Sequence, residues 1–187
     1  MDSSGDALSK NKEKLALLER YKKEVLIGIF GSFHGSRKKD LILLREFLIS
    51  EGYNARISED LDDRYDEGKK IDDPQKNREL SVRLIDESDA HIFIFNERDE
   101  NEPENLIQSV SMELERLHTL CENGHLSANY VAIYLQNQSL DSTGGVFKGL
   151  IMQKKNDWII GKFKEIHELF KPVRQVCYDC LRDKFRF

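Results

Sequence analysis

Long apolar stretches are absent from this sequence, and its first residues are polar. A membrane-spanning helix needs about 20 predominantly apolar residues, and a secretory signal needs an apolar segment of roughly 7–15 residues. We therefore expect a soluble protein with no membrane partner, located in the cytoplasm.

Cysteine is scarce, with 3 in 187 residues, and an odd number does not indicate a disulfide framework. Cys177 and Cys180 form one CxxC, and His125 follows Cys121 by four residues, so a four-ligand zinc site can be drawn. The two pairs lie far apart in sequence, and no second CxxC exists. Reduced structural cysteines are the favoured interpretation, and we predict neither metal nor cofactor.

Positive charge is also in deficit, since 29 Lys and Arg face 34 Asp and Glu, a formal net charge of −5. Duplex nucleic acid is disfavoured as the main partner, because neutralising its phosphates requires excess Lys and Arg. A small anionic ligand needs only a local positive site. A hydrophobic fraction of 39% is enough for one domain with a buried core.

Nucleotide motifs of the P-loop type (GxxxxGK[ST]) and the dinucleotide type (GxGxxG) are missing, which disfavours ATPases and dinucleotide-dependent oxidoreductases. Instead, apolar runs alternate with amphipathic segments. This alternation predicts an α/β fold, a three-layer Rossmann-like (flavodoxin-like) parallel sheet of about five strands with helices on both faces. The expected strands are Val25–Phe30, Tyr53–Ser58, Ala90–Glu97, Tyr130–Leu135 and Trp158–Ile160. The expected helices are Leu8–Lys23, Ser36–Ser50, Gln75–Ser88, Ile107–Asn123, Lys164–Phe170 and Pro172–Lys184.

This pattern divides the chain into three parts: an N-terminal helical extension over 1–24, an α/β domain over 25–170, and a C-terminal helix over 171–187. Within the extension, Met1–Gly5 are expected to be disordered. Ligands of parallel α/β sheets bind beyond the carboxyl ends of the strands. The segments Gly31–Arg37, Asn96–Glu113 and Gln136–Gly145 should therefore converge.

The stretch "GSFHGSR" ends the first strand with glycines, serines, a histidine and an arginine before a helix start. Glycines allow close backbone approach, and a helix start presents unpaired N–H groups and a partial positive charge, so the loop is a candidate phosphate site. The alternative is that Ser36 only caps the helix. The candidate binding residues of this edge are Gly31, Ser32, His34, Gly35, Ser36, Arg37, Asn96, Ser109 and Ser111.

Glu113 is the candidate catalytic residue. On a helical wheel it lies roughly 70° from the middle of the apolar stripe, whereas Glu115 lies roughly 130° away and faces water. A carboxylate at the edge of a ligand crevice can act as a nucleophile or an acid/base group at a sugar carbon. The alternative is an ordinary surface glutamate in the first turns of a helix. The acidic run Glu59–Asp73 fits no EF-hand and is interpreted as solvated charge.

Five stretches of the chain resemble the nucleoside 2-deoxyribosyltransferase-like family, and within it the 2′-deoxynucleoside 5′-monophosphate N-glycosidases. They are "GSFHGSRKKD", "LIDESDAHIFIF", "SVSMEL", "VFKG" and "DWIIGKFKEIHELF". The resemblance implies cleavage of the N-glycosidic bond of a nucleotide-like substrate, with Glu113 as the nucleophile at C1′. It also implies that Ser32, Gly35 and Arg37 bind the 5′-phosphate, and that two copies form a homodimer.

The chain departs from the family pattern at several positions: Gly28 stands for a tyrosine, Ser81 for an aspartate, His34 for an arginine, and Ser109 and Ser111 for glycines. Two alternatives therefore stay open. One is a nucleotide-binding or protein-interaction module that has lost the chemistry. The other is an NAD-consuming TIR-like domain, which shares the sheet layout and a catalytic glutamate.

Overall fold

Five parallel strands form a sheet in the order β2-β1-β3-β4-β5. The computed structural model describes residues 3–33, 35–62, 74–97, 106–137, 145–154 and 158–186. The order is that of flavodoxin-like folds, in which the chain reverses direction across the sheet between β1 and β3. The strands are β1 (Leu26–Phe30), β2 (Asn54–Arg56), β3 (Ala90–Phe95), β4 (Val131–Gln136) and β5 (Ile159–Phe163).

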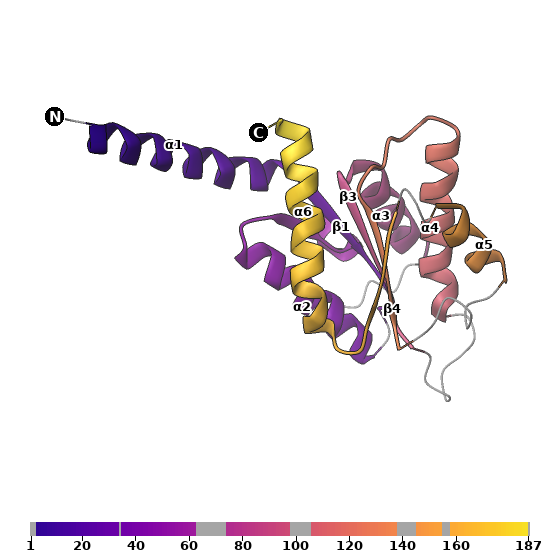
Figure 1. Ribbon diagram of the computed structural model, residues 1–187. Coiled ribbons are helices and arrows are strands. Elements are labelled where there is room, and N and C mark those ends of the chain that lie inside the picture. The colour runs from indigo at the N-terminus through magenta and orange to yellow at the C-terminus, as the bar shows by residue number, and fades with distance from the viewer. Residues whose placement is uncertain are drawn as a thin grey trace.

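Helices cover both faces of the sheet, as Figure 1 shows. Buried side chains of α2 and α6 form one core with the sheet, and those of α3, α4 and α5 form the other. The predicted three-layer α/β arrangement is confirmed. The helices are α1 (Ser3–Glu24), α2 (Ser36–Ser50), α3 (Pro74–Glu87), α4 (Leu106–Glu122), α5 (Gly145–Lys154) and α6 (Phe170–Phe185), with short 3-10 turns η1 (Ser58–Leu61) and η3 (Ile166–Leu169).

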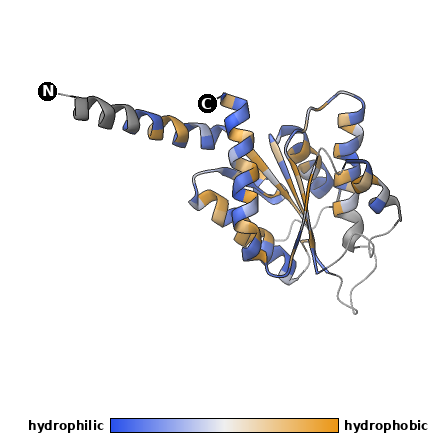
Figure 2. Ribbon diagram, in the orientation of Figure 1, coloured by the Kyte–Doolittle hydropathy of each residue, from blue (hydrophilic) through white to orange (hydrophobic). Residues whose placement is uncertain are grey.

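The central strand β3 explains the two cores. All six of its residues are buried, and they alternate between the faces, as period-two geometry requires. Ile92 and Ile94 join the core under α2 and α6, while Phe93 and Phe95 join the core under α3 and α4. Figure 2 shows hydrophobic residues along the strands in the middle of the sheet.

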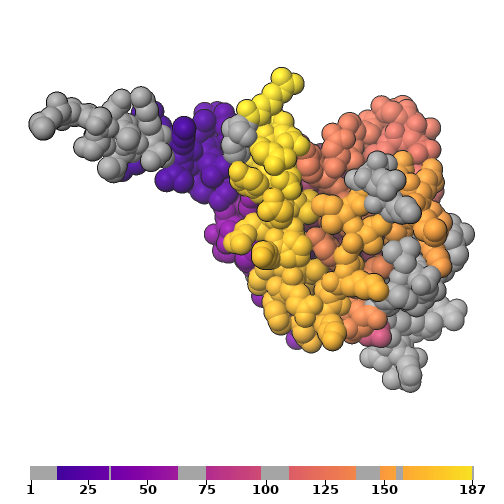
Figure 3. All heavy atoms as spheres, viewed as in Figure 1, coloured from indigo at the N-terminus to yellow at the C-terminus, as the bar shows by residue number. Residues whose placement is uncertain are grey.

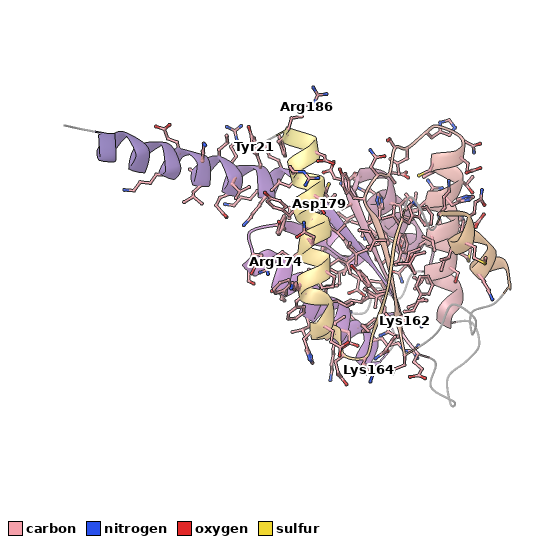
Figure 4. All side chains as sticks on the ribbon, viewed as in Figure 1. Tyr21, Lys162, Lys164, Arg174, Asp179 and Arg186 are labelled. Carbon is pink, nitrogen blue, oxygen red and sulfur yellow. The ribbon has the colours of Figure 1, made fainter. Side chains whose placement is uncertain are left out.

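Helix α1 extends away from the body of the molecule (Figures 1 and 3). Its C-terminal end is docked: the ring of Tyr21 stacks on Phe185 at 4.0 Å, and Figure 4 places Tyr21 beside the end of α6. The disorder predicted for the first five residues is wrong from Ser3 onward. Once one end of a helix is fixed, each added residue gains a hydrogen bond, so the helix continues outward through a segment without proline.

Two C-terminal elements also differ from the sequence prediction. Val146–Gly149, which the sequence analysis places in no helix, lies inside α5, where packing of Leu150 and Ile151 on the core overrides the poor helix propensity of glycine. Helix α6 begins before Pro172, because proline is tolerated in the first turn of a helix. Within the described residues, every helix is too short or too polar to cross a membrane.

Candidate functional site

The strand order changes direction between β1 and β3, and the carboxyl edge of the sheet at this point is where ligands of such folds bind. Gly31 and Ser32 follow β1, and Asn96 and Glu97 follow β3. Two of the three segments that the sequence brings to this edge therefore meet here. The third is represented by Gln136, which ends β4 and contacts Asn96.

The two glycines of the loop after β1 have different reasons to be glycine. A Cβ on Gly31 would lie 2.5 Å from Leu41 Cδ2, so this glycine lets α2 pack closely on the strand. Gly35 has φ +56° and open space around its Cα, so it supplies a backbone conformation that other residues avoid. Gly35 is the N-cap residue of α2, and it makes no side-chain capping hydrogen bond. The alternative in which Ser36 caps the helix is therefore wrong: Ser36 is the first helical residue.

Arg37 was predicted to bind phosphate, and it makes a protein contact at the same edge. The residue is only 7% exposed, and its guanidinium donates a hydrogen bond of 2.5 Å to the backbone carbonyl of Glu97. This bond ties the first turn of α2 to the segment after β3. Ser32 is also buried at this edge, whereas His34 lies outside the described residues.

Asn96 is 5% exposed and is held in a hydrogen-bond network that joins three strand ends. Its Nδ2 donates to Gln136 Oε1 at 3.2 Å, and the same oxygen accepts the backbone N–H of Glu97. Gln136 Nε2 in turn donates to the carbonyl of Lys164 at 3.0 Å, beyond the end of β5 (Figure 4). Within the part of the chain that the structure describes, Asn96 Oδ1 has no hydrogen-bond partner. A buried acceptor without a partner is unusual and calls for an explanation.

Glu113 lies in the N-terminal half of α4, partly buried, and faces α3. Burial raises the pKa of its carboxyl group from 4.5 to about 7, and the Ser81 hydroxyl opposes this rise by donating a hydrogen bond to the charged form. A carboxyl with a pKa near neutral is well suited to proton transfer. Ser111 is partly buried on the same helix, and the side chain of Ser109 lies outside the described residues. Glu115 is exposed, as the wheel predicted.

Gly28 stands where the resembled family has a tyrosine, and the site has no room for one. A Cβ on Gly28 would lie 2.4 Å from Ser88 Oγ and 2.8 Å from the ring of Phe30. Phe30 stacks on Phe93 at 4.8 Å and is itself buried. The aromatic volume in this region therefore comes from Phe30, two residues further along the same face of β1.

Sequence reasoning missed two polar residues. The sequence analysis noted Ser81 only as a departure from the family. In the structure its hydroxyl, on α3, contacts the carboxyl group of Glu113 on α4. His91 is fully buried near the amino end of β3, where burial lowers its pKa and its Nε2 contacts the carbonyl of Ile85 at 2.9 Å. His91 belongs to the apolar core rather than to the carboxyl edge.

The four residues considered as zinc ligands in the sequence analysis do not come together. Cys177 and Cys180 are buried in the core under α2 and α6, whereas Cys121 packs against the core on the other face of the sheet. No metal-binding cluster of His, Cys, Asp and Glu occurs in the described ranges. The reduced, structural interpretation of the cysteines agrees with three free thiols.

The described start of the acidic run is not solvated charge, which corrects the sequence interpretation there. Glu59 pairs with Lys38 at 2.6 Å, Asp60 pairs with the buried Arg45 at 2.5 Å, and Asp62 pairs with a lysine of α3. These carboxylates fix η1 against α2 and α3. Residues 63–73 of the run lie outside the described residues.

Comparisons with known proteins add little to this picture. No family model matches the chain, and no curated protein matches it. Among solved structures, a conserved protein from Enterococcus faecalis V583 is similar at 9% sequence identity and a TM-score of 0.44, covering 81% of this chain and 98% of that one. Any function must therefore be argued from the residues themselves.

Proposed function

We propose that this chain cleaves the N-glycosidic bond of a nucleotide-like substrate, with a nucleoside 5′-monophosphate favoured, and that Glu113 is the nucleophile. The observation that carries the proposal is the position of Glu113: a partly buried carboxyl, hydrogen-bonded to Ser81, on a helix that begins at the carboxyl edge of the sheet. The start of α2 at the same edge, where a glycine is the N-cap residue, suits a phosphate.

In the proposed reaction the bond between C1′ and the base nitrogen breaks, and its electron pair leaves with the base, which takes a proton from solvent. The carboxylate of Glu113 stabilises the cationic sugar and forms a bond to C1′. Water then attacks C1′, releases the carboxylate and gives the free sugar phosphate. The hydrogen bond from Ser81 favours the ionised carboxylate that the first step needs.

Phosphate binding would orient the sugar. The partial positive charge of the α2 start favours an anion, and Gly35 leaves its Cα side open. Holding the phosphate there would fix C1′ relative to the catalytic carboxyl, which is how positioning accelerates a reaction. A homodimer is part of this proposal on the resemblance alone, and a cytoplasmic location is part of it because the sequence lacks long apolar stretches.

Base release tests the proposal. Deoxynucleoside monophosphates, nucleosides and NAD are incubated with the protein, and free base is followed by chromatography. We expect release from monophosphates that falls at least 100-fold in Glu113→Gln. Glu115→Gln, two residues away and exposed, is the matched control and should keep full activity. Equal release by wild type and Glu113→Gln would refute the proposal, and release from NAD alone would favour the TIR-like alternative.

A nucleotide-binding module without catalysis is the second candidate, favoured by the filled space over Gly28 and by Ser81 in place of an aspartate. The chain therefore lacks the tyrosine and the aspartate of the resembled family, and with them the side chains that would activate the leaving base. Saturable nucleotide binding by calorimetry, dependent on the phosphate and without base release, would support this candidate.

A further inference from the structure

We infer that the ligand held at the start of α2 carries a hydroxyl group beside its phosphate, and that Asn96 Oδ1 accepts a hydrogen bond from that hydroxyl. The choice of a phosphate-bearing ligand rests on the proposed function. The inference adds what the ligand must present to the protein: an anion and a hydrogen-bond donor on one small molecule, as in a sugar phosphate.

The first step concerns the side-chain oxygen of Asn96. The side chain is 5% exposed, its Nδ2 is engaged by Gln136, and Oδ1 has no partner among the described residues. Leaving a buried acceptor unpaired is unfavourable, so such a group persists where a ligand or water completes it. An accepting oxygen selects a ligand that donates, which excludes a bare phosphate dianion.

The second step is direction. Nδ2 of Asn96 points toward Gln136, at the end of β4, so Oδ1 is on the branch of the amide turned away from that residue. The strand on the other side of β3 is β1, and α2 follows it. The bond from Arg37 to the carbonyl of Glu97 holds the first turn of α2 against the residue next to Asn96. Asn96, which carries Oδ1, is thus the chain neighbour of the residue that Arg37 holds, and the inference places the anion at the helix start beside the donor at Oδ1.

The third step is rigidity. Gln136 is bonded to Asn96, to the backbone of Glu97 and to the carbonyl of Lys164, so the Asn96 amide cannot rotate without breaking this network. A preorganised acceptor discriminates between ligands better than a mobile one, because no ordering is needed on binding. Asn96 is thus a specificity-determining residue in this inference, and it takes no part in bond cleavage.

Calorimetry with three simple phosphates tests the inference without any cleavable bond. Ribose 5-phosphate and glycerol 3-phosphate carry hydroxyls, whereas ethyl phosphate has the anion alone. We expect wild type to bind one of the hydroxyl-bearing phosphates at least about tenfold more tightly than ethyl phosphate. In Asn96→Leu this difference should disappear, while the melting temperature stays unchanged or rises because the unpaired acceptor is gone.

Two further variants keep the test decisive. Asn96→Asp keeps the shape and adds a negative charge beside the phosphate, so it should weaken all three ligands. Asn129→Leu, exposed and before β4, is the control and should bind as wild type does. Equal affinity of the three phosphates for wild type, full discrimination by Asn96→Leu, or no binding at all would overturn the inference. Base release dependent on Glu113 in the same preparation would leave the proposed function standing.

Discussion

Ser81 on α3 donates a side-chain hydrogen bond to Glu113 on α4, across the contact between the two helices that cover the same face of the sheet. Burial raises the pKa of the carboxyl and this bond lowers it, so two opposing effects meet at one group. The state of Glu113 at neutral pH is therefore sensitive to small changes around it, since its pKa lies near 7.

Removing the Ser81 hydroxyl should raise the pKa of Glu113 further. In Ser81→Ala the desolvation remains and the hydrogen bond to the charged form is lost, so the carboxyl should titrate at a higher pH than in the wild type. Carbon-detected NMR of the glutamate side-chain carboxyl against pH measures this directly. Ser81→Thr keeps a hydroxyl and should restore the wild-type value. A lower pKa in Ser81→Ala would contradict the assigned role.

Glu113 should also make the stability of the fold pH-dependent. Its pKa is about 7 in the folded protein and near 4.5 when exposed, so between these values the folded state binds the proton more strongly. The free energy of unfolding should fall as pH rises from about 4.5 to 7, by about 3 kcal/mol, and stay low above that.

Glu113→Gln should remove that dependence, because an amide cannot ionise. We expect the variant to be more stable than wild type at pH 8 and similar to it at pH 4, measured by urea unfolding at both values. Glu115→Gln provides the comparison for a general charge effect, since Glu115 is exposed on the same helix. A parallel fall of stability with pH in wild type and Glu113→Gln would show that the dependence arises elsewhere.

The order of strands and helices could be predicted because burial leaves strong patterns. The run Ala90–Phe95 is apolar throughout, as a strand covered on both faces must be, and the apolar residues of α2 recur at helical spacing. Helix α5 was not predicted, because its two glycines lower the helix propensity of the segment and its packing on the core depends on residues distant in sequence. The helical wheel predicted that Glu113 flanks the buried stripe, and its partial burial agrees, but the contact with Ser81 was not predicted.

The contacts at the carboxyl edge could not be predicted in the same way. They depend on which backbone carbonyl an arginine reaches and which amide meets another across the sheet. Arg37 was expected to serve a ligand and binds the carbonyl of Glu97. Gln136 was expected at this edge as the start of a converging segment, but its hydrogen bond to Asn96 was not. Sequence spacing fixes the edge at which such side chains gather, and the three-dimensional register fixes their partners.

Gly28 should tolerate no side chain. In Gly28→Ala the new Cβ would lie 2.4 Å from Ser88 Oγ, and this hydroxyl is held by a 2.6 Å bond to the carbonyl of Leu84. We expect a loss of about 1–3 kcal/mol in the free energy of unfolding by urea titration. Gly149→Ala, in α5 with open space around its Cα, should be neutral or stabilising. Wild-type stability of Gly28→Ala would mean that the strand yields easily there.

The thiols should fall into two classes of reactivity. Burial raises the pKa of Cys180 to about 12 and that of Cys177 further, and both lie in the core, whereas Cys121 is partly exposed on α4. Because the thiolate is the reactive form, a chromogenic disulfide reagent at pH 8 should modify one thiol rapidly in the folded protein and all three after unfolding. Cys121→Ser should abolish the rapid reaction, and a chelator should leave the melting temperature unchanged. Rapid modification of two or more thiols, or a lower melting temperature with chelator, would revive a metal-binding or redox role for the CxxC pair.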